Sequence, residues 1–282
     1  MQQQIVIDIP PDIYTKPEII ADAEDLVREI YFSKLVAKNN LSDSESAEYE
    51  KFIEQFITED DEPVDNILSE KQQKLLTSSL YASWQPVDEN GEPRQFMATA
   101  NVGLYARLNP KIKAIVPDVL VSLDVTVPKN PREKRHRSYM VWEFGKPPDI
   151  VVEIVSNEIG GELDEKLGKY ARIGVDYYVV FDPEYFLSDD ILLVYQRDLE
   201  NGYRLREDFR LPGTGLNLTL WRGDFEDWAD TKWIRWTDNN GNLLLTGKER
   251  ADKESLRADK EALRAEQLAA KLRELGVDPK KI

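Results

Sequence analysis

The chain has 282 residues, and its 37 Lys and Arg against 53 Asp and Glu give a net charge of −16. It has no cysteine and a single histidine, His136, which excludes disulfides, thiolate metal sites, cysteine nucleophiles and a multi-histidine metal site within one chain. The acidity argues against a protein that binds polyanions over its whole surface, but it allows a local cationic groove.

The first 65 residues carry most of the acidity, with a net charge of −12, and their pattern predicts two helices. Ser42 and Glu45 form a capping box that predicts the start of the second. The first follows Pro17 and carries an apolar stripe of Ile19, Ile20, Ala23, Leu26, Val27 and Ile30. We interpret residues 1–65 as an acidic helical extension on the core. A segment that binds a partner or mimics DNA is the alternative.

Residues 66–246 are expected to form the principal domain, which begins with a third helix. Ser69 and Gln72 repeat the capping-box signature ahead of Leu75, Leu76 and Leu80. After this helix the periodicity changes to that of strands, which are predicted at 96–106, 117–125, 149–155 and 177–181.

A helix is predicted over residues 162–174, ending at Gly174, between the last two of these strands. Strand, helix and strand within about thirty residues form a βαβ-like unit. A meander over 191–196 and 203–207 follows, then a Trp-rich stretch and a turn at Asn240-Gly241.

The last segment, residues 247–282, has a net charge of +2 and predicts a charged helix over 248–275. Leu256 and Leu263 are seven residues apart, but the other leucines do not keep this interval, so a coiled-coil seam has little support. Two interpretations remain for this segment: a solvated helix, or a helix that contacts a second copy of the chain.

Three polar residues interrupt the apolar pattern of the domain. Glu153 falls within the run 149–155, where alternation places it on the same strand face as Val151 and Val155. A carboxylate in such surroundings is costly unless a cation or hydrogen-bond donors compensate it. The alternative is a glutamate that forms a salt bridge at the edge of the sheet.

Asp118 and Lys166 complete the set. Asp118 stands at the start of another predicted strand, where it is either a turn residue or a second acid that converges with Glu153 on one hard divalent cation. Lys166 falls on the apolar stripe of the 162–174 helix, whereas Lys169 groups with the polar face. Lys166 either extends to the rim of the core or reaches the two carboxylates.

With these residues the chain resembles the PD-(D/E)XK nuclease superfamily and, within it, the Uma2-type restriction endonucleases, a domain family of unknown function. The resemblance implies an α+β or α/β fold: a restriction-endonuclease-like mixed sheet flanked by helices, with a helical N-terminal extension and a long C-terminal helix. The motifs that carry it are PDVLV (117–121), PPDIVVEIVSNE (147–158), DEKLGKYARIGVDYYVVFDP (164–183) and AAKLRELGVDP (269–279).

The resemblance implies that Mg²⁺ or Mn²⁺ is held by Asp118, Glu153 and the main-chain carbonyl of Ile154. The superfamily places its lysine two residues after the acid, and that position is Val155 here. Lys166, on the following helix, matches the lysine of this branch and would position the attacking water. Supporting roles are implied for three further residues, namely Asp149, Ser156 and Glu70.

A basic loop, KNPREKRHR (129–137), lies between the two acidic strands. It could neutralise DNA phosphates, or it could be only a solvated loop. We expect His136 to be exposed rather than catalytic. The five cations of the loop are Lys129, Arg132, Lys134, Arg135 and Arg137.

The sequence thus predicts a Mg²⁺-dependent endonuclease that hydrolyses DNA. The alternatives are a catalytically inactive nuclease-fold scaffold that acts through protein contacts and a metal-dependent hydrolase of another phosphate ester. A homodimer through the sheet edge or the C-terminal helix is possible on this pattern. The N-terminus predicts no signal peptide and no stretch approaches about 18 apolar residues, so we expect a cytoplasmic protein without a membrane segment.

Overall fold

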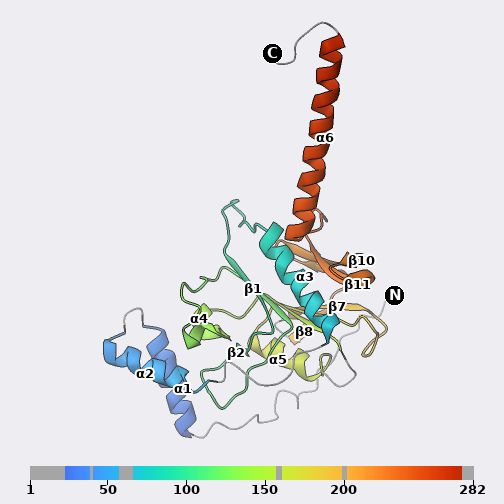
Figure 1. Cartoon of the computed structure of the whole chain (residues 1–282). Coiled ribbons are helices and arrows are strands. Elements are labelled where there is room, and N and C mark those ends of the chain that lie inside the picture. The colour runs from blue at the N-terminus through green and yellow to red at the C-terminus, as the bar shows by residue number, and fades with distance from the viewer. Residues whose placement is uncertain (1–22, 39–40, 57–65, 157–160, 199–201, 275–282) are drawn as a thin grey trace.

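The computed structural model describes residues 23–38, 41–56, 66–156, 161–198 and 202–274 (Figure 1). Its centre is a six-stranded sheet with the order β1-β3-β5-β6-β7-β8. Only β5 and β6 run parallel, and the other neighbours are antiparallel. The strands are β1 (Phe96–Ala100), β3 (Val119–Leu123), β5 (Ile150–Ile154), β6 (Tyr177–Phe181), β7 (Leu192–Asp198) and β8 (Gly202–Leu205).

Helix α5 (Glu165–Ile173) connects the two parallel strands, as the βαβ-like pattern predicted. Its C-terminal cap, Gly174, has a φ of 93°, the left-handed conformation that favours glycine. The mixed α+β architecture agrees with the fold class that the sequence predicted.

The two faces of the sheet have separate hydrophobic cores, because successive residues of a strand point to opposite faces. On one face, α3 (Ile67–Ser83) and a second sheet pack against Val121, Val152 and Val179. On the other face, α5 packs against Val151, Tyr178 and their neighbours. Two short parallel strands, β2 (Leu104–Tyr105) and β4 (Tyr139–Met140), add Leu104 and Tyr139 to this second core.

The predicted strand 96–106 is interrupted in the structure. Asn101 has a φ of 52° and separates β1 from β2. Asparagine tolerates this left-handed conformation better than most residues, which allows the chain to leave the sheet here.

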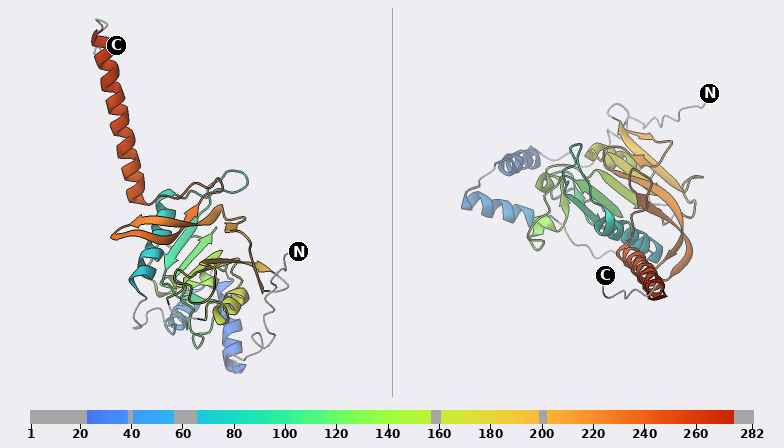
Figure 2. Two further views of the ribbon diagram at one scale, coloured as in Figure 1. Left: turned by 90° about the vertical axis from the view of Figure 1, so that its right-hand side faces the viewer. Right: turned by 90° about the horizontal axis from the view of Figure 1, so that it is seen from above.

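Helices α1 (Ala23–Val36) and α2 (Asp43–Ile53) lie together at one side of the body (Figures 1 and 2). The capping box of Ser42 and Glu45 is present, as predicted. The predicted first helix is present over Ala23–Val36, but the apolar stripe that indicated it is not the buried face. Its described members Leu26, Val27 and Ile30 are exposed, and Phe32 and Leu35 pack instead against α2, while Pro17, Ile19 and Ile20 lie outside the described residues.

Helix α3 begins three residues earlier than its predicted capping box. Asn66 is the N-cap and accepts a hydrogen bond from the backbone N–H of Ser69. Gln72 is fully buried and bonds both the N–H and the C=O of Ile234 on β11 (Trp228–Thr237), at 2.9 Å each. The signature Ser69–Gln72 therefore marks a tertiary contact rather than a helix start.

The second sheet has the order β11-β10-β9 and consists of the long hairpin β10 (Leu216–Phe225) to β11 with the short β9 (Arg210–Leu211). Because β11 is an edge strand, the Gln72 amide takes the place of a neighbouring strand at Ile234. Beyond β11, the chain reverses at Asn240-Gly241, where Thr237 and Leu243 form a bridge, as the turn signal predicted.

Helix α6 (Gly247–Glu274) projects from the body as a single arm of about 42 Å at 1.5 Å per residue (Figure 2). None of its residues is buried. Its base is fixed by Glu249, which pairs with the buried Arg235 at 2.7 Å and accepts from the N–H of Thr246. Within the part of the chain that is described, no helix combines the length and apolarity needed to cross a membrane. Two more short helices complete the fold, the 3-10 turn η2 (Lys134–His136) and α4 (Val141–Phe144).

Replacing Gln72 with leucine should lower the free energy of unfolding by about 2–4 kcal/mol, because the buried N–H and C=O of Ile234 then lack partners. Glu70→Gln, an exposed position on the same helix, is the control and should change it by less than about 0.5 kcal/mol. Urea denaturation followed by tryptophan fluorescence measures both. Equal stabilities of the two variants would contradict the role given to the Gln72 contact.

Candidate active site

The two predicted acids lie at the same end of adjacent strands. In the antiparallel pair β3–β5, Val119 is opposite Val152, and the next step of this register brings Asp118 opposite Glu153. Residues that face each other across an antiparallel pair project from the same face of the sheet and have neighbouring side chains. That face is the one covered by α5. The structure therefore brings Asp118 and Glu153 together.

Asp118 is almost completely buried and its carboxylate is held from two directions. Its Oδ1 accepts a hydrogen bond from Nε2 of Gln73 on α3 at 2.8 Å. Its Oδ2 accepts from the backbone N–H of Ile154 on β5 at 2.6 Å. Asp118 is thus not a simple turn residue, because its side chain links the start of β3 to the end of β5 and to α3.

Glu153 is the most deeply buried acid of the site, with 2% of its surface exposed. Its Oε2 pairs with the Lys166 ammonium at 2.9 Å, and its Oε1 accepts from the Tyr170 hydroxyl at 2.5 Å. Both partners come from α5, one turn apart. The Lys166 ammonium thus reaches Glu153, one of the two predicted acids, rather than only the rim of the core.

The charges of this cluster depend strongly on one another. Burial raises the pKa of the Glu153 carboxyl above its usual value, and Lys166 and Tyr170 offset only part of this effect. Burial would by itself lower the pKa of the Lys166 ammonium, but Glu153 and Glu162 outweigh it and raise this pKa. The pKa of Tyr170 is also raised, through burial and the neighbouring Glu153 and Asp118. The lysine therefore stays charged at neutral pH.

A further buried acid, Glu162, lies just before α5 and was not predicted from the sequence to belong to the site. Its Oε1 pairs with the Lys166 ammonium at 3.0 Å, so that the ammonium lies between two carboxylates. Its Oε2 is buried and has no hydrogen-bond partner among the described residues. The i to i+4 spacing of Glu162 and Lys166 could have indicated the pair. Gln73 and the Tyr170 hydroxyl carried no comparable signal in the sequence.

The residues expected to support the site lie at different places. Asp149 is at the other end of β5, where it accepts from the N–H of Leu123 and pairs with Lys146 at 2.6 Å. Ser156 follows β5, two residues beyond Ile154. Glu70 is exposed and pairs with Lys71 on the surface of α3, the helix whose Gln73 contacts Asp118.

Val155, at the superfamily's lysine position, is buried in the core beneath α5. A lysine there would have to place its ammonium among apolar side chains such as Leu167 and Tyr178, at a large desolvation cost. The packing thus explains why the strand carries valine.

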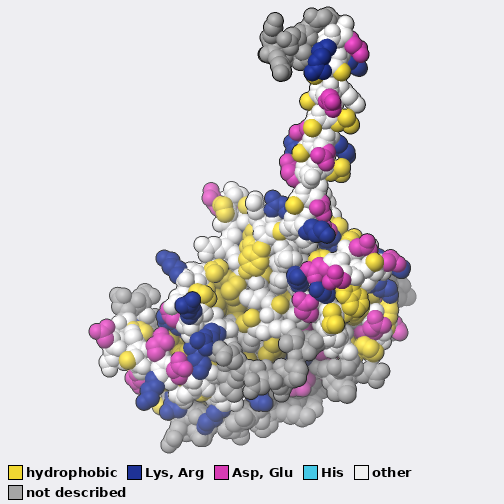
Figure 3. All heavy atoms as spheres, in the orientation of Figure 1, with side chains coloured by type: hydrophobic (Ala, Val, Ile, Leu, Met, Phe, Trp, Pro, Cys, Tyr) yellow, Lys and Arg dark blue, Asp and Glu magenta, His cyan; other side chains and the backbone are white. Residues whose placement is uncertain are grey.

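The basic loop 129–137 lies against α2, on the side of the molecule where Lys and Arg side chains gather in Figure 3. Lys134 donates to the carbonyl of Glu54 at 2.7 Å, and Arg135 lies 2.5 Å from Glu133 and 3.6 Å from Glu50. Acids of the N-terminal extension and of the loop itself therefore engage these two cations.

The other three loop cations, Lys129, Arg132 and Arg137, have exposed side chains. His136 is partly exposed, and its Nδ1 lies 2.6 Å from the carbonyl oxygen of Asn130 in the same loop.

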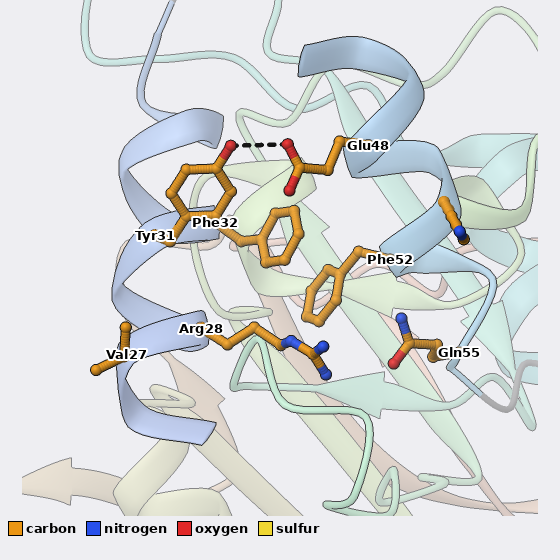
Figure 4. A pocket seen from close by; sticks show the side chains of 8 residues that line it. Val27, Arg28, Tyr31, Phe32, Glu48, Phe52 and Gln55 are labelled. Atoms are coloured by element: carbon orange, nitrogen blue, oxygen red, sulfur yellow. Dashed lines mark hydrogen bonds between the residues drawn. The ribbon is translucent and has the colours of Figure 1, made fainter. Parts of the chain in front are cut away.

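A hollow of about 820 Å³ lies elsewhere, between α1 and α2 (Figure 4). Stacked rings of Phe32 and Phe52 form its floor, and Tyr31 donates to Glu48 at 2.8 Å across it. Asp118, Glu153 and Lys166 are not among the residues that line this groove, so the groove is separate from the candidate active site.

Asp118 and Glu153 carry the oxygen donors that a hard divalent cation prefers. Within the described ranges, no group of three or more His, Asp or Glu side chains is arranged to hold a metal ion. Mg²⁺ needs fewer, because it commonly binds one or two carboxylates and keeps several waters. Asp118 and Glu153 supply two such carboxylates, each oxygen of which can accept more than one partner. When ionised, the carboxylates of Asp118, Glu153 and Glu162 carry more negative charge than the single positive charge of Lys166 neutralises.

Comparison with known proteins gives one finding. The sequence model of Uma2, described as “Putative restriction endonuclease”, matches residues 47–220. This range contains Asp118, Glu153 and Lys166, and it ends before the predicted motif at 269–279. The comparison with curated proteins found no match.

Lys166→Met should lower the free energy of unfolding by about 3 kcal/mol at pH 8, because it leaves the buried acids without a cation. The loss should be smaller at pH 5. Without the Lys166 ammonium, the pKa of Glu153, which burial already raises, should rise further. The protonated carboxyl then stabilises the fold at low pH, and this contribution is lost as the pH rises through the raised pKa. Urea denaturation at the two pH values measures it.

Two controls accompany this measurement. Lys169→Met removes a cation from the same helix that pairs with the exposed Glu165, and it should have little effect at either pH. Glu153→Gln in the Lys166→Met background should reduce the pH dependence. Equal destabilisation by Lys166→Met at pH 5 and pH 8 would contradict the coupling between the two groups.

Proposed function

Since the chain belongs to the Uma2 family, we propose that it is a metal-dependent endonuclease that hydrolyses phosphodiester bonds of DNA. The observation that supports this most is the cluster of Asp118, Glu153 and Lys166 on one face of the sheet. Two buried acids can hold a cation that activates a phosphodiester bond and a water, and the ammonium beside Glu153 can offset negative charge.

In the proposed site, Asp118 and Glu153 would hold Mg²⁺ or Mn²⁺ together with the main-chain carbonyl of Ile154. When bound, such a cation polarises a phosphoryl oxygen and lowers the pKa of a coordinated water. Gln73 and the N–H of Ile154 fix the orientation of the Asp118 carboxylate. Tyr170 does the same for Glu153. These contacts hold both acids in place before substrate arrives, which is what electrostatic preorganisation requires.

Lys166 is proposed to hold the attacking water and to offset negative charge that develops on the phosphoryl group. An ammonium has three N–H donors, and Glu153 and Glu162 accept two of them. With no third acceptor among the residues that the structure describes, the third N–H is proposed to bond a water or phosphate oxygen. The side chain of Lys166 is 30% exposed, so the ammonium lies at the boundary between the core and solvent.

A catalytically inactive scaffold is the second candidate. It is favoured by the two carboxylates that already engage the ammonium of Lys166 and by Val155 at the superfamily's lysine position. The two candidates differ in one measurable property, because a scaffold has no metal-dependent nicking activity that a site variant could remove.

Nicking of supercoiled plasmid in Mg²⁺ or Mn²⁺ tests the proposal. Alanine at Asp118, Glu153 or Lys166 should reduce the rate by about 100-fold or more, because each removes a group that acts on developing charge. Two matched controls should keep the wild-type rate: Asp124→Ala, at the other end of β3, and Lys169→Ala, on the same helix as Lys166. Equal nicking by all variants would identify a contaminating nuclease and reject the enzyme.

The exposed part of the basic loop is proposed to contact DNA phosphates. Replacing Lys129, Arg132 and Arg137 together with glutamine should weaken binding to a DNA duplex in Ca²⁺. The slope of log K against log salt concentration should also become shallower by up to about 2.7, since each phosphate contact contributes about 0.9. Fluorescence anisotropy at several salt concentrations measures both quantities.

Lys134→Gln with Arg135→Gln is the comparison for this experiment. These two cations face α2, so their replacement should change the slope by less than the triple variant does. An unchanged slope in the triple variant would assign DNA binding to another surface.

A further inference from the structure

We propose that Glu162 is a positioning residue of this site, which fixes the Lys166 ammonium and accepts a hydrogen bond from the water that the ammonium holds. The inference rests on the proposed function and adds a third acid to it. The observation behind it is that Oε2 of Glu162 is buried and has no hydrogen-bond partner among the described residues.

A buried carboxylate oxygen without a donor is unfavourable, and such atoms in native proteins are usually explained by a bound water or ion, or by a catalytic role. Only 5% of the surface of Glu162 is exposed. Its other oxygen, Oε1, is 3.0 Å from the ammonium of Lys166. Oε2 is therefore next to the group that is proposed to hold the attacking water, and a water shared by the two would satisfy it.

The backbone of Glu162 is anchored to the sheet. Its carbonyl accepts a hydrogen bond from the Tyr178 hydroxyl on β6 at 2.9 Å, within the second core. The N–H of Lys166 bonds the carbonyl of Gly161 at 3.0 Å and closes the turn that leads into α5. The acid and the ammonium are thus held in one geometry by the sheet and the first turn of the helix.

A purely structural ion pair does not require this arrangement. Glu153 alone, with Lys166 and Tyr170, would already form a satisfied buried pair. A second buried carboxylate adds its own desolvation cost and repels Glu153. Glu162 fixes the orientation of the ammonium. Because two of its N–H groups bond Glu153 and Glu162, the tetrahedral geometry of the nitrogen sets the direction of the third. This is the contribution expected of a residue that acts through another.

Glu162→Gln tests the role, with Glu165→Gln as the matched control. The glutamine keeps the shape and one acceptor for Lys166, but its amide cannot accept a hydrogen bond in place of the second oxygen. Glu165 is an exposed acid nearby on α5 that pairs with Lys169. We expect kcat for cleavage of a DNA duplex to fall about 10- to 100-fold in Glu162→Gln, with KM changed less than about threefold, and no change in Glu165→Gln.

Mn²⁺ binding, measured by calorimetry without DNA, separates positioning from metal ligation. Glu162→Gln should keep the wild-type affinity within about threefold. A loss of affinity comparable to that of Glu153→Gln would overturn the proposal by making Glu162 a metal ligand. Identical kcat values for Glu162→Gln and Glu165→Gln would also overturn it.

A readout that needs neither metal nor activity is the NMR signal of the Lys166 ammonium. Held between two carboxylates, it should show restricted motion in the wild type and in Glu165→Gln, and greater motion in Glu162→Gln. If the wild type did not cleave DNA, the proposed function would fail, and this signal would still decide whether Glu162 positions Lys166. Unchanged ammonium motion in Glu162→Gln would overturn the inference.

Discussion

The burial of the Glu153 carboxylate is the constraint around which the domain is arranged. A charge with 2% exposure in a strand is tolerated only where cationic and hydrogen-bonding partners reach it. The fold supplies them through α5, whose first and second turns bring Lys166 and Tyr170 to the two carboxylate oxygens. The parallel pair β5–β6 makes this possible, because the connection between parallel strands must cross the face of the sheet.

The second acid depends on a different element of the topology. Strand β3 is antiparallel to β5, so that the start of one lies beside the end of the other. Asp118 and Glu153 therefore lie side by side at the same end of two neighbouring strands, although 34 residues separate them in the chain. Helix α3 on the opposite face of the sheet then reaches around this end with Gln73. Both layers that cover the sheet thus contribute to the site.

Much of this arrangement follows from the sequence, for identifiable reasons. The strand over 177–181 and the helix that ends at Gly174 carry strong local signals, and the polarity of Glu153 and Lys166 conflicts with their apolar surroundings. The sequence could not indicate which polar groups would meet from distant elements. Gln72, which bonds β11, has the appearance of a capping residue, and α1 exposes Leu26, Val27 and Ile30 of its apolar stripe.

The connection of acid and ammonium through helix packing has an evolutionary consequence. In a motif confined to one strand, the distance between the two groups is fixed by the strand's own repeat, and the intervening residues cannot change in number. Here the separation is set by the contact of α5 with the sheet, through residues such as Leu167 and Tyr178. The chain between Glu153 and α5 can therefore lengthen or shorten across homologues without disturbing the pair, whereas drift in the packing residues would disturb it from a distance.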